Sequence, residues 1–171
     1  MPQPVTGDYA PFYQTYVSYC AAHETDALDT LSGSLAEMEQ WLRQIPETQK
    51  DYAYAPGKWT VAQLLQHMAD TERVFAYRAL AIARGEQQPL PGFDENAWSN
   101  EAPATHRSIA GLVEELLQLR QLTITLFQSI SPAQMSNKGL ASGQPITVNA
   151  LAFIMVGHVR HHQRIYSERY C

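Results

Sequence analysis

Four long stretches of this chain carry apolar residues at spacings of three and four, and this pattern constrains the fold more than any other feature. Such spacing places apolar side chains on one face of an α-helix, so each stretch predicts an amphipathic helix. The predicted helices cover about Glu24 to Gln44, Thr60 to Gly85, Ser108 to Ser129 and Val148 to Arg169. No stretch has the period of a β-strand with hairpin turns. The expected fold class is therefore all-α, a four-helix bundle.

Residue types at the ends of these stretches support the helix boundaries. Thr60 and Gln63 match the capping-box pattern, so the second helix is expected to begin there. Thr147 is a typical N-cap for the last helix, and Pro46 ends the first one.

The connections between the helices differ in length. Residues 9–20 predict a short helix with an aromatic face, and residues 139–145 predict a loop. The connection over residues 87–107 is long and contains several prolines. Because long connections in compact domains tend to be functional, this one is expected to cover a pocket.

Composition and charge restrict the class of protein. With 171 residues, of which 45% are hydrophobic, the chain is expected to form one globular domain over residues 1–171. A net charge of -5 without a basic block argues against nucleic-acid binding. Two cysteines without a metal-ligand spacing, no signal peptide and no long apolar run predict a soluble cytoplasmic protein with no membrane span.

The last predicted helix carries the residues that best indicate chemistry. His158 and His162 are four residues apart, so their side chains are expected to lie about 5.4 Å apart along one helix face. Two imidazoles at that separation can share one metal ion. His161 points about 100° away from His162 and is not expected to share it. The alternative is that His162, which lies within the apolar stripe, is a core histidine hydrogen-bonded to a tyrosine or a carbonyl.

The second predicted helix carries a candidate third ligand, with a histidine at the rim of that helix as the alternative interpretation. His67 lies at the edge of its apolar face, and Asp70 is close enough to orient His67 or to act as a base. Bundles build metal sites from side chains on facing helices. Three histidines with no fourth protein ligand match an open, catalytic type of site, and they suit zinc, nickel, copper and iron alike.

Several sequence segments resemble the DinB superfamily in the same order along nearly the whole chain. They are YAPGKWT (54–60), HMADTERVFAYR (67–78), LPGFDENAW (90–98), GH followed by HH (157–162) and ERY (168–170). The resemblance implies a four-helix bundle with up-down-down-up topology. It also implies a divalent metal, usually nickel or zinc, held by a histidine triad that falls on His67, His158 and His162. Relatives of this kind are frequently homodimers.

The resemblance leaves three functions open. In the favoured one, the metal activates a low-molecular-weight thiol such as bacillithiol, mycothiol or glutathione, and the protein is a transferase for a small-molecule substrate. In the second, it is a hydrolase that uses metal-bound water and needs a base, for which Asp70 is the candidate. In the third, it is a non-enzymatic stress protein that binds a metal or ligand.

Other residues have weaker assignments. Three arginines are candidates to bind the carboxylates of a thiol, with solvated or ion-paired side chains as the alternative: Arg78, Arg160 and Arg164. Two residues of the long connection, Asp94 and Trp98, are candidates to approach the pocket, and the alternative for Trp98 is a hydrophobic plug. Three aromatic residues are assigned to the core, with a position lining a pocket as the alternative: Trp59, Phe75 and Tyr77.

Overall fold

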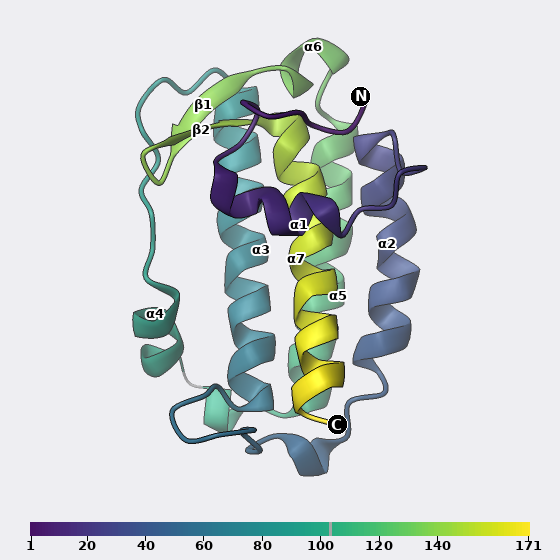
Figure 1. Ribbon diagram of the computed structural model, residues 1–171, viewed down its shortest axis with the longest axis vertical. Coiled ribbons are helices and arrows are strands. Elements are labelled where there is room, and N and C mark those ends of the chain that lie inside the picture. Colours follow the sequence, from purple (N-terminus) through teal and green to yellow (C-terminus); the bar gives the residue numbers. More distant parts are fainter. Residues whose placement is uncertain (103) are drawn as a thin grey trace.

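Four long helices run along the longest axis of the molecule in the computed structural model, which describes residues 1–102 and 104–171 (Figure 1). They are α2 (Ala27–Leu42), α3 (Val61–Ala83), α5 (Ile109–Gln128) and α7 (Val148–Arg169). The shorter helices are η1 (Pro11–Tyr13), α1 (Gln14–Ser18), η2 (Glu47–Gln49), α4 (Glu95–Glu101), η3 (Ala104–His106) and α6 (Pro132–Met135). The long helices match the four predicted stretches, and the predicted four-helix bundle is confirmed.

The order and direction of the helices follow the up-down-down-up topology. α3 and α5 run in one direction, and α2 and α7 run in the other (Figure 1). Both α2 and α3 pack against α5 and α7. Because α3 and α5 are parallel neighbours, the chain must return along the bundle between them. That return carries α4 along the outside of α3 (Figure 1).

The helix ends follow the capping chemistry expected from the sequence. The hydroxyl of Thr60 accepts from the backbone N–H of Gln63 at 3.2 Å, and the Gln63 side chain accepts from the Thr60 N–H at 2.9 Å. Thr147 caps α7 by accepting from the Ala150 N–H. The first long helix begins at Ala27 rather than near residue 24, because the Asp26 carboxylate caps it.

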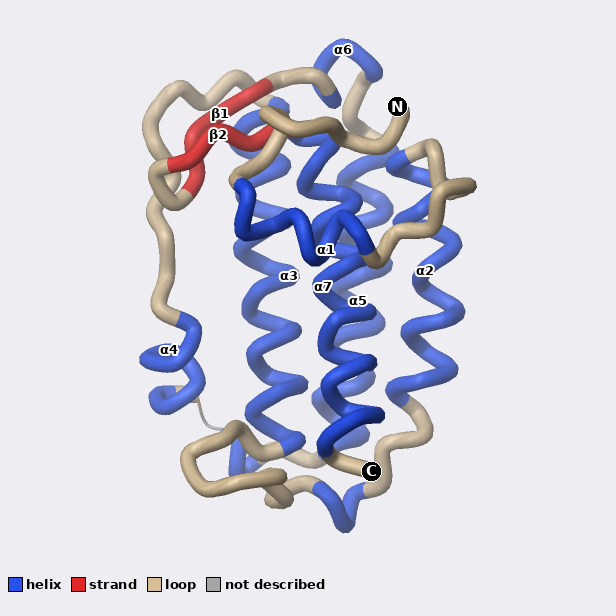
Figure 2. Tube along the Cα trace, viewed as in Figure 1, coloured by secondary structure: helices blue, strands red, loops and turns tan. Residues whose placement is uncertain are grey.

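A β-hairpin replaces the loop that was predicted over residues 139–145, so that prediction was wrong. The hairpin joins β1 (Lys138–Ala141) to β2 (Gln144–Thr147) beside the end of α3 (Figure 2). Its two turn residues, Ser142 and Gly143, both have positive φ angles, 53° and 74°, as tight hairpins require. Leu90 pairs with this hairpin through two backbone hydrogen bonds. Strands of four residues are too short to give a detectable period.

The N-terminal helix α1 lies across the bundle and contacts α7 closely (Figure 1). The contact needs glycine at position 157, because a Cβ atom there would lie 1.9 Å from the carbonyl oxygen of Tyr16. The close approach brings the Tyr16 ring to 5.4 Å from the His158 ring, centroid to centroid.

A buried guanidinium connects all four long helices within the core. Arg120 of α5 donates to both carboxylate oxygens of Glu72 on α3, at 2.8 and 2.9 Å. It also donates to the hydroxyl of Ser34 on α2 at 2.9 Å and to the carbonyl of Met155 on α7 at 3.2 Å. This arrangement fixes the helices to one another in the interior of the bundle.

The assignment of Tyr77 to the core was wrong. Phe75 is buried as predicted, but 58% of Tyr77 is exposed. Side chains two positions apart on a helix differ by about 200° in direction, so residues 75 and 77 do not share a face. Among the described residues, no helix is long and apolar enough to span a membrane.

Candidate metal centre

Three histidines meet in the interior of the bundle. His67 comes from α3, and His158 and His162 come from successive turns of α7. The Nε2 atom of His158 lies 3.1 Å from Nε2 of His67 and 3.0 Å from Nε2 of His162. One ligand atom from each histidine lies within 4.8 Å of the other two. These are the three histidines on which the sequence prediction of a metal site depends.

The surroundings of the histidines keep them in the form that ligates metals. Burial lowers the pKa of His67 to about 4, and it lowers the pKa of both His158 and His162 well below the usual value. All three imidazoles are therefore neutral at pH 7. Within residues 1–102 and 104–171, no carboxylate forms an ion pair with any of the three.

The donor set fits a divalent transition metal. Three converging nitrogen lone pairs cannot all be satisfied by one another, and among the described residues Nδ1 of His162 has no hydrogen-bond partner. Zinc–nitrogen bonds of about 2.0–2.1 Å are compatible with ligand nitrogens separated by about 3 Å. Three neutral imidazoles suit several divalent transition metals and leave positions free for small molecules.

Two cavities meet at the histidine cluster. The first, of about 270 Å³, contacts His67 and His162, and the second, of about 260 Å³, contacts His67 and His158. Besides His67, two residues line both cavities, Tyr16 and Glu95. Small molecules can therefore approach the histidines from two sides.

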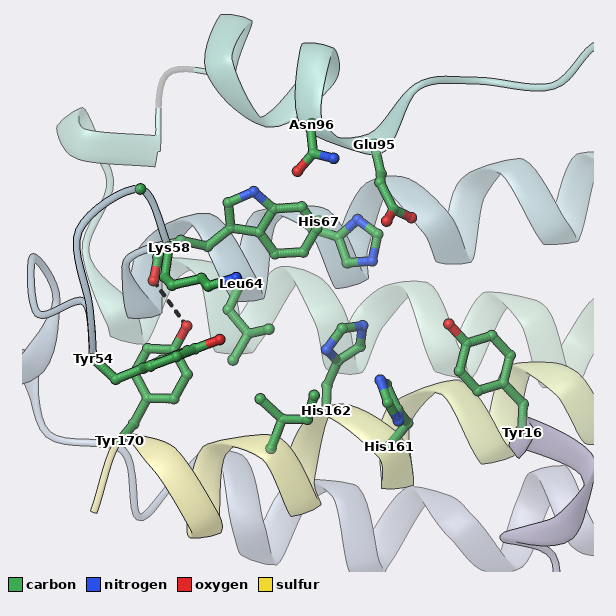
Figure 3. A pocket seen from close by; sticks show the side chains of 13 residues that line it. Tyr16, Tyr54, Lys58, Leu64, His67, Glu95, Asn96, His161, His162 and Tyr170 are labelled. Atoms are coloured by element: carbon green, nitrogen blue, oxygen red, sulfur yellow. Dashed lines mark hydrogen bonds between the residues drawn. The ribbon is translucent and has the colours of Figure 1, made fainter. Parts of the chain in front are cut away.

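Glu95 and Tyr16 were not identified from the sequence. In Figure 3 the Glu95 carboxylate points toward His67, and the Tyr16 hydroxyl points into the same cavity. Burial and the nearby Glu95 carboxylate raise the pKa of Tyr16 to about 12, so the phenol remains protonated at neutral pH. The sequence placed Asp94 at the pocket instead. Asp94 caps α4 by accepting from the Asn96 and Ala97 N–H groups, and this cap positions the next residue, Glu95.

The Asp70 carboxylate interacts with residues outside the histidine cluster. It accepts a hydrogen bond from Gln66 at 3.0 Å and lies 3.5 Å from a guanidinium nitrogen of Arg73. Asp70 lines a third, apolar cavity of about 390 Å³ together with Trp98, whose ring centroid lies 4.8 Å from that of the tilted Phe93 ring. No described hydrogen bond connects Asp70 to His67, so the carboxylate beside the cluster is that of Glu95.

Trp59 lines the first cavity, and its ring centroid lies 4.6 Å from that of His67. The Tyr170 hydroxyl donates to the Trp59 carbonyl at 2.8 Å, which fixes the segment before α3 to the end of α7 (Figure 3). His161 also faces this cavity, beside Tyr16. Trp59 is therefore a wall residue of the site as well as a packing residue.

The three candidate arginines have different environments. Arg160 pairs with Glu24 and Glu37, and Arg164 pairs with its helix neighbour Glu168. These two are therefore ion-paired, as the alternative interpretation expected. Arg78 is 1% exposed and lines the second cavity.

These features define a helical bundle with a buried three-histidine cluster that opens to two cavities. The chain belongs to the DinB superfamily, whose family model matches residues 30–165. It is 25% identical over 131 residues to "Putative metal-dependent hydrolase YfiT" of Bacillus subtilis (strain 168), covering 74% of this chain and 72% of that protein. It is 30% identical over 117 residues to "Putative metal-dependent hydrolase OB0782" of Oceanobacillus iheyensis, covering 67% of this chain and 66% of that protein.

Solved structures agree with the fold. The structure of YfiT from Bacillus subtilis, described as a probable metal-dependent hydrolase with an unusual four-helix bundle topology, superimposes with a TM-score of 0.72 at 23% identity. That match covers 83% of this chain and 82% of YfiT. The mycothiol-dependent maleylpyruvate isomerase superimposes with a TM-score of 0.67 at 14% identity, covering 86% of this chain and 61% of the isomerase.

Proposed function

We propose that this protein is a metal-dependent hydrolase of a small-molecule ester or amide, with one divalent ion, zinc or nickel, held by His67, His158 and His162. The observation that carries this proposal is the Glu95 carboxylate, which faces the histidine cluster from a wall shared by both cavities. The naming of its relatives as metal-dependent hydrolases supports the same class of reaction. A divalent ion at this position would lower the pKa of water and polarise a carbonyl group.

The residues of this chain would supply the proton transfers. Glu95 accepts a proton from the attacking water while the oxygen of that water bonds to the carbonyl carbon of the substrate. It then returns that proton to the leaving alkoxide or amine as the ester or amide bond breaks. Tyr16, with its raised pKa, stays protonated and donates a hydrogen bond to the oxygen that gains negative charge. The neutral state of the buried histidines keeps their lone pairs available for the ion.

The experiment combines metal content with hydrolysis of p-nitrophenyl butyrate. The wild-type protein is expected to carry about one equivalent of zinc or nickel. His67→Ala is expected to lose the metal and the activity together. Glu95→Gln should retain the metal and lose about 10²- to 10⁴-fold in kcat/KM, the usual contribution of a general base.

The matched control is Glu101→Gln, an exposed residue at the other end of α4, which should keep full activity. Unchanged activity in metal-loaded Glu95→Gln would contradict the role of Glu95. A wild-type protein that neither contains nor takes up zinc or nickel would contradict the whole proposal.

A second candidate is the thiol-dependent transferase, and the two cavities favour it. A reaction between a thiol and an electrophile needs space for two molecules at one centre, and the histidines are reached from two cavities of similar size. The fold also superimposes on part of the mycothiol-dependent maleylpyruvate isomerase. Glutathione added to cobalt-loaded protein would change the metal absorption spectrum if thiols bind there. No change with glutathione, cysteine or bacillithiol would exclude this candidate.

A further inference from the structure

One face of α3 extends the site beyond the histidines. His67, Thr71, Phe75 and Arg78 follow one another at steps of four, four and three residues, so they lie on the same side of the helix. All four line the second cavity, of about 260 Å³. The cavity therefore runs along α3 from an imidazole at one end to a guanidinium at the other.

Arg78 is a buried cation without a carboxylate partner. It is 1% exposed, and it donates to the Pro91 carbonyl at 2.8 Å, the Ser142 hydroxyl at 3.0 Å and the Tyr13 hydroxyl at 3.4 Å. All three acceptors are uncharged. Among the ion pairs of residues 1–102 and 104–171, none includes Arg78.

The same bundle contains a second fully buried arginine, which provides an internal comparison. Arg120 is 0% exposed, and its guanidinium is paired with both oxygens of the Glu72 carboxylate. A buried charge without such a partner is costly, so a buried arginine with a purely structural role is expected to be paired. Arg78 lacks this pairing and lies against a cavity, so a ligand can provide the missing anion.

Thr71 provides an independent observation. It is 2% exposed, and its hydroxyl oxygen has no hydrogen-bond partner among the described residues. Buried hydroxyl groups are nearly always hydrogen-bonded in folded proteins. Since Thr71 lines the same cavity, between His67 and Arg78, its hydroxyl is available to a molecule bound there.

We propose that Arg78 and Thr71 form an anion-binding end of the substrate site, and that the natural substrate carries a carboxylate group remote from the bond that reacts. This inference rests on the proposed function, which places the reacting bond at the histidines. Three of the five N–H donors of Arg78 are taken by Pro91, Ser142 and Tyr13, so the guanidinium offers a carboxylate its positive charge and the remaining N–H groups on Nε and Nη1.

The distance between His67 and Arg78, and the side chains that lie between them, indicate what connects the reacting bond of such a substrate to its carboxylate group. His67 and Arg78 are eleven residues apart, about 16 Å of helix rise, and helical side chains lean toward the N-terminus, which brings the guanidinium closer. The Phe75 ring lies between, with its centroid 5.7 Å from Arg78 Cζ and 6.1 Å from the His158 ring centroid. Aromatic side chains form much of the remaining wall, including Phe12 and Phe93. An apolar chain or ring therefore suits the middle of the substrate.

The test measures binding of small carboxylates by isothermal titration calorimetry to the metal-loaded protein as purified. The probes are butyrate, glutarate and benzoate, each compared with its uncharged amide. Wild-type protein is expected to bind at least one carboxylate about tenfold or more tightly than its amide, since hydrogen bonds to charged groups are the stronger ones. Arg78→Gln should remove that preference, and Arg78→Lys should retain part of it.

Two further variants separate ligand binding from folding. Thr71→Val has nearly the same shape, so it should weaken carboxylate binding several-fold without lowering the thermal midpoint. Arg84→Gln removes the same charge from an exposed position at the end of α3 and should leave binding unchanged.

Three outcomes would overturn the anion site: no carboxylate preference in the wild type at millimolar concentrations, the same preference in Arg78→Gln, or unaltered binding in both Thr71→Val and Arg78→Lys. In the last case Arg78 would only brace Pro91 and Ser142. Glu95→Gln distinguishes this inference from the proposed function. Lost hydrolysis with the preference intact supports both, whereas intact hydrolysis in that variant contradicts the role of Glu95 as the base and leaves the anion site standing.

Discussion

Replacing Arg120 with methionine tests whether the buried ion pair holds the bundle together. Methionine is unbranched and similar in length, so Arg120→Met mainly removes polar interactions rather than volume. The substitution eliminates the two hydrogen bonds to Glu72 and the single hydrogen bonds to Ser34 and the Met155 carbonyl. The Glu72 carboxylate, 5% exposed, is then left buried without a counter-ion.

The expected destabilisation follows from that burial. Removing one partner of a buried ion pair costs about 3–5 kcal/mol, because an uncompensated charge remains in the interior. For a chain of this size, 1 kcal/mol corresponds to about 2–4 °C in thermal midpoint, so the midpoint should fall by roughly 6–20 °C. The metal affinity should fall as well, because the pair joins α3 to α7, the two helices that carry the histidines.

Urea unfolding followed by circular dichroism measures the change in unfolding free energy. The variants are Arg120→Met, Glu72→Leu and the double substitution, which replaces both charges with apolar groups. The double variant should be more stable than either single variant, since no unpaired charge remains. Arg43→Met is the control, because its exposed pair with Glu39 should contribute less than about 1 kcal/mol. A destabilisation below about 1 kcal/mol in Arg120→Met, or strict additivity in the double variant, would refute the reasoning.

Two further predictions concern the packing of α1 and the protonation of the histidines. Gly157→Ala should destabilise the fold by about 1–3 kcal/mol or more and displace Tyr16 from the site, because the new Cβ would overlap the Tyr16 carbonyl. Gly33→Ala in α2, where nothing lies within 4 Å, should instead be neutral or stabilising in the same urea titration. Because burial lowers the pKa of His67 from 6.5 to about 4, the unfolded chain binds protons there that the folded chain does not. The metal-free protein should therefore lose stability as pH falls from about 6.5 to about 4. An equal loss of stability over this pH range in a His67→Gln variant would contradict the assignment of the effect to His67.

Local patterns in the sequence determined most of the architecture. The spacing of apolar residues identified the four long helices, and Thr60 and Gln63 placed the start of α3 because a capping box depends only on neighbouring residues. The same spacing placed His158 and His162 one turn apart. It could also have excluded Tyr77 from the core, since Phe75 already occupies the buried face of that turn.

Tertiary structure decided which distant side chains share the site. Glu95 reaches the histidines because the connection after α3 returns along the bundle, and Tyr16 reaches them because α1 packs on Gly157. The spacing of apolar residues does not predict where such segments pack, since their positions depend on interactions with residues far away in the chain. The same holds for Arg78, whose lack of a carboxylate partner is visible only when its neighbours from α1, the connection and the hairpin are assembled around it. The spacing of apolar residues predicts which face of a helix is buried, whereas the packing of the folded chain determines which residues that face contacts.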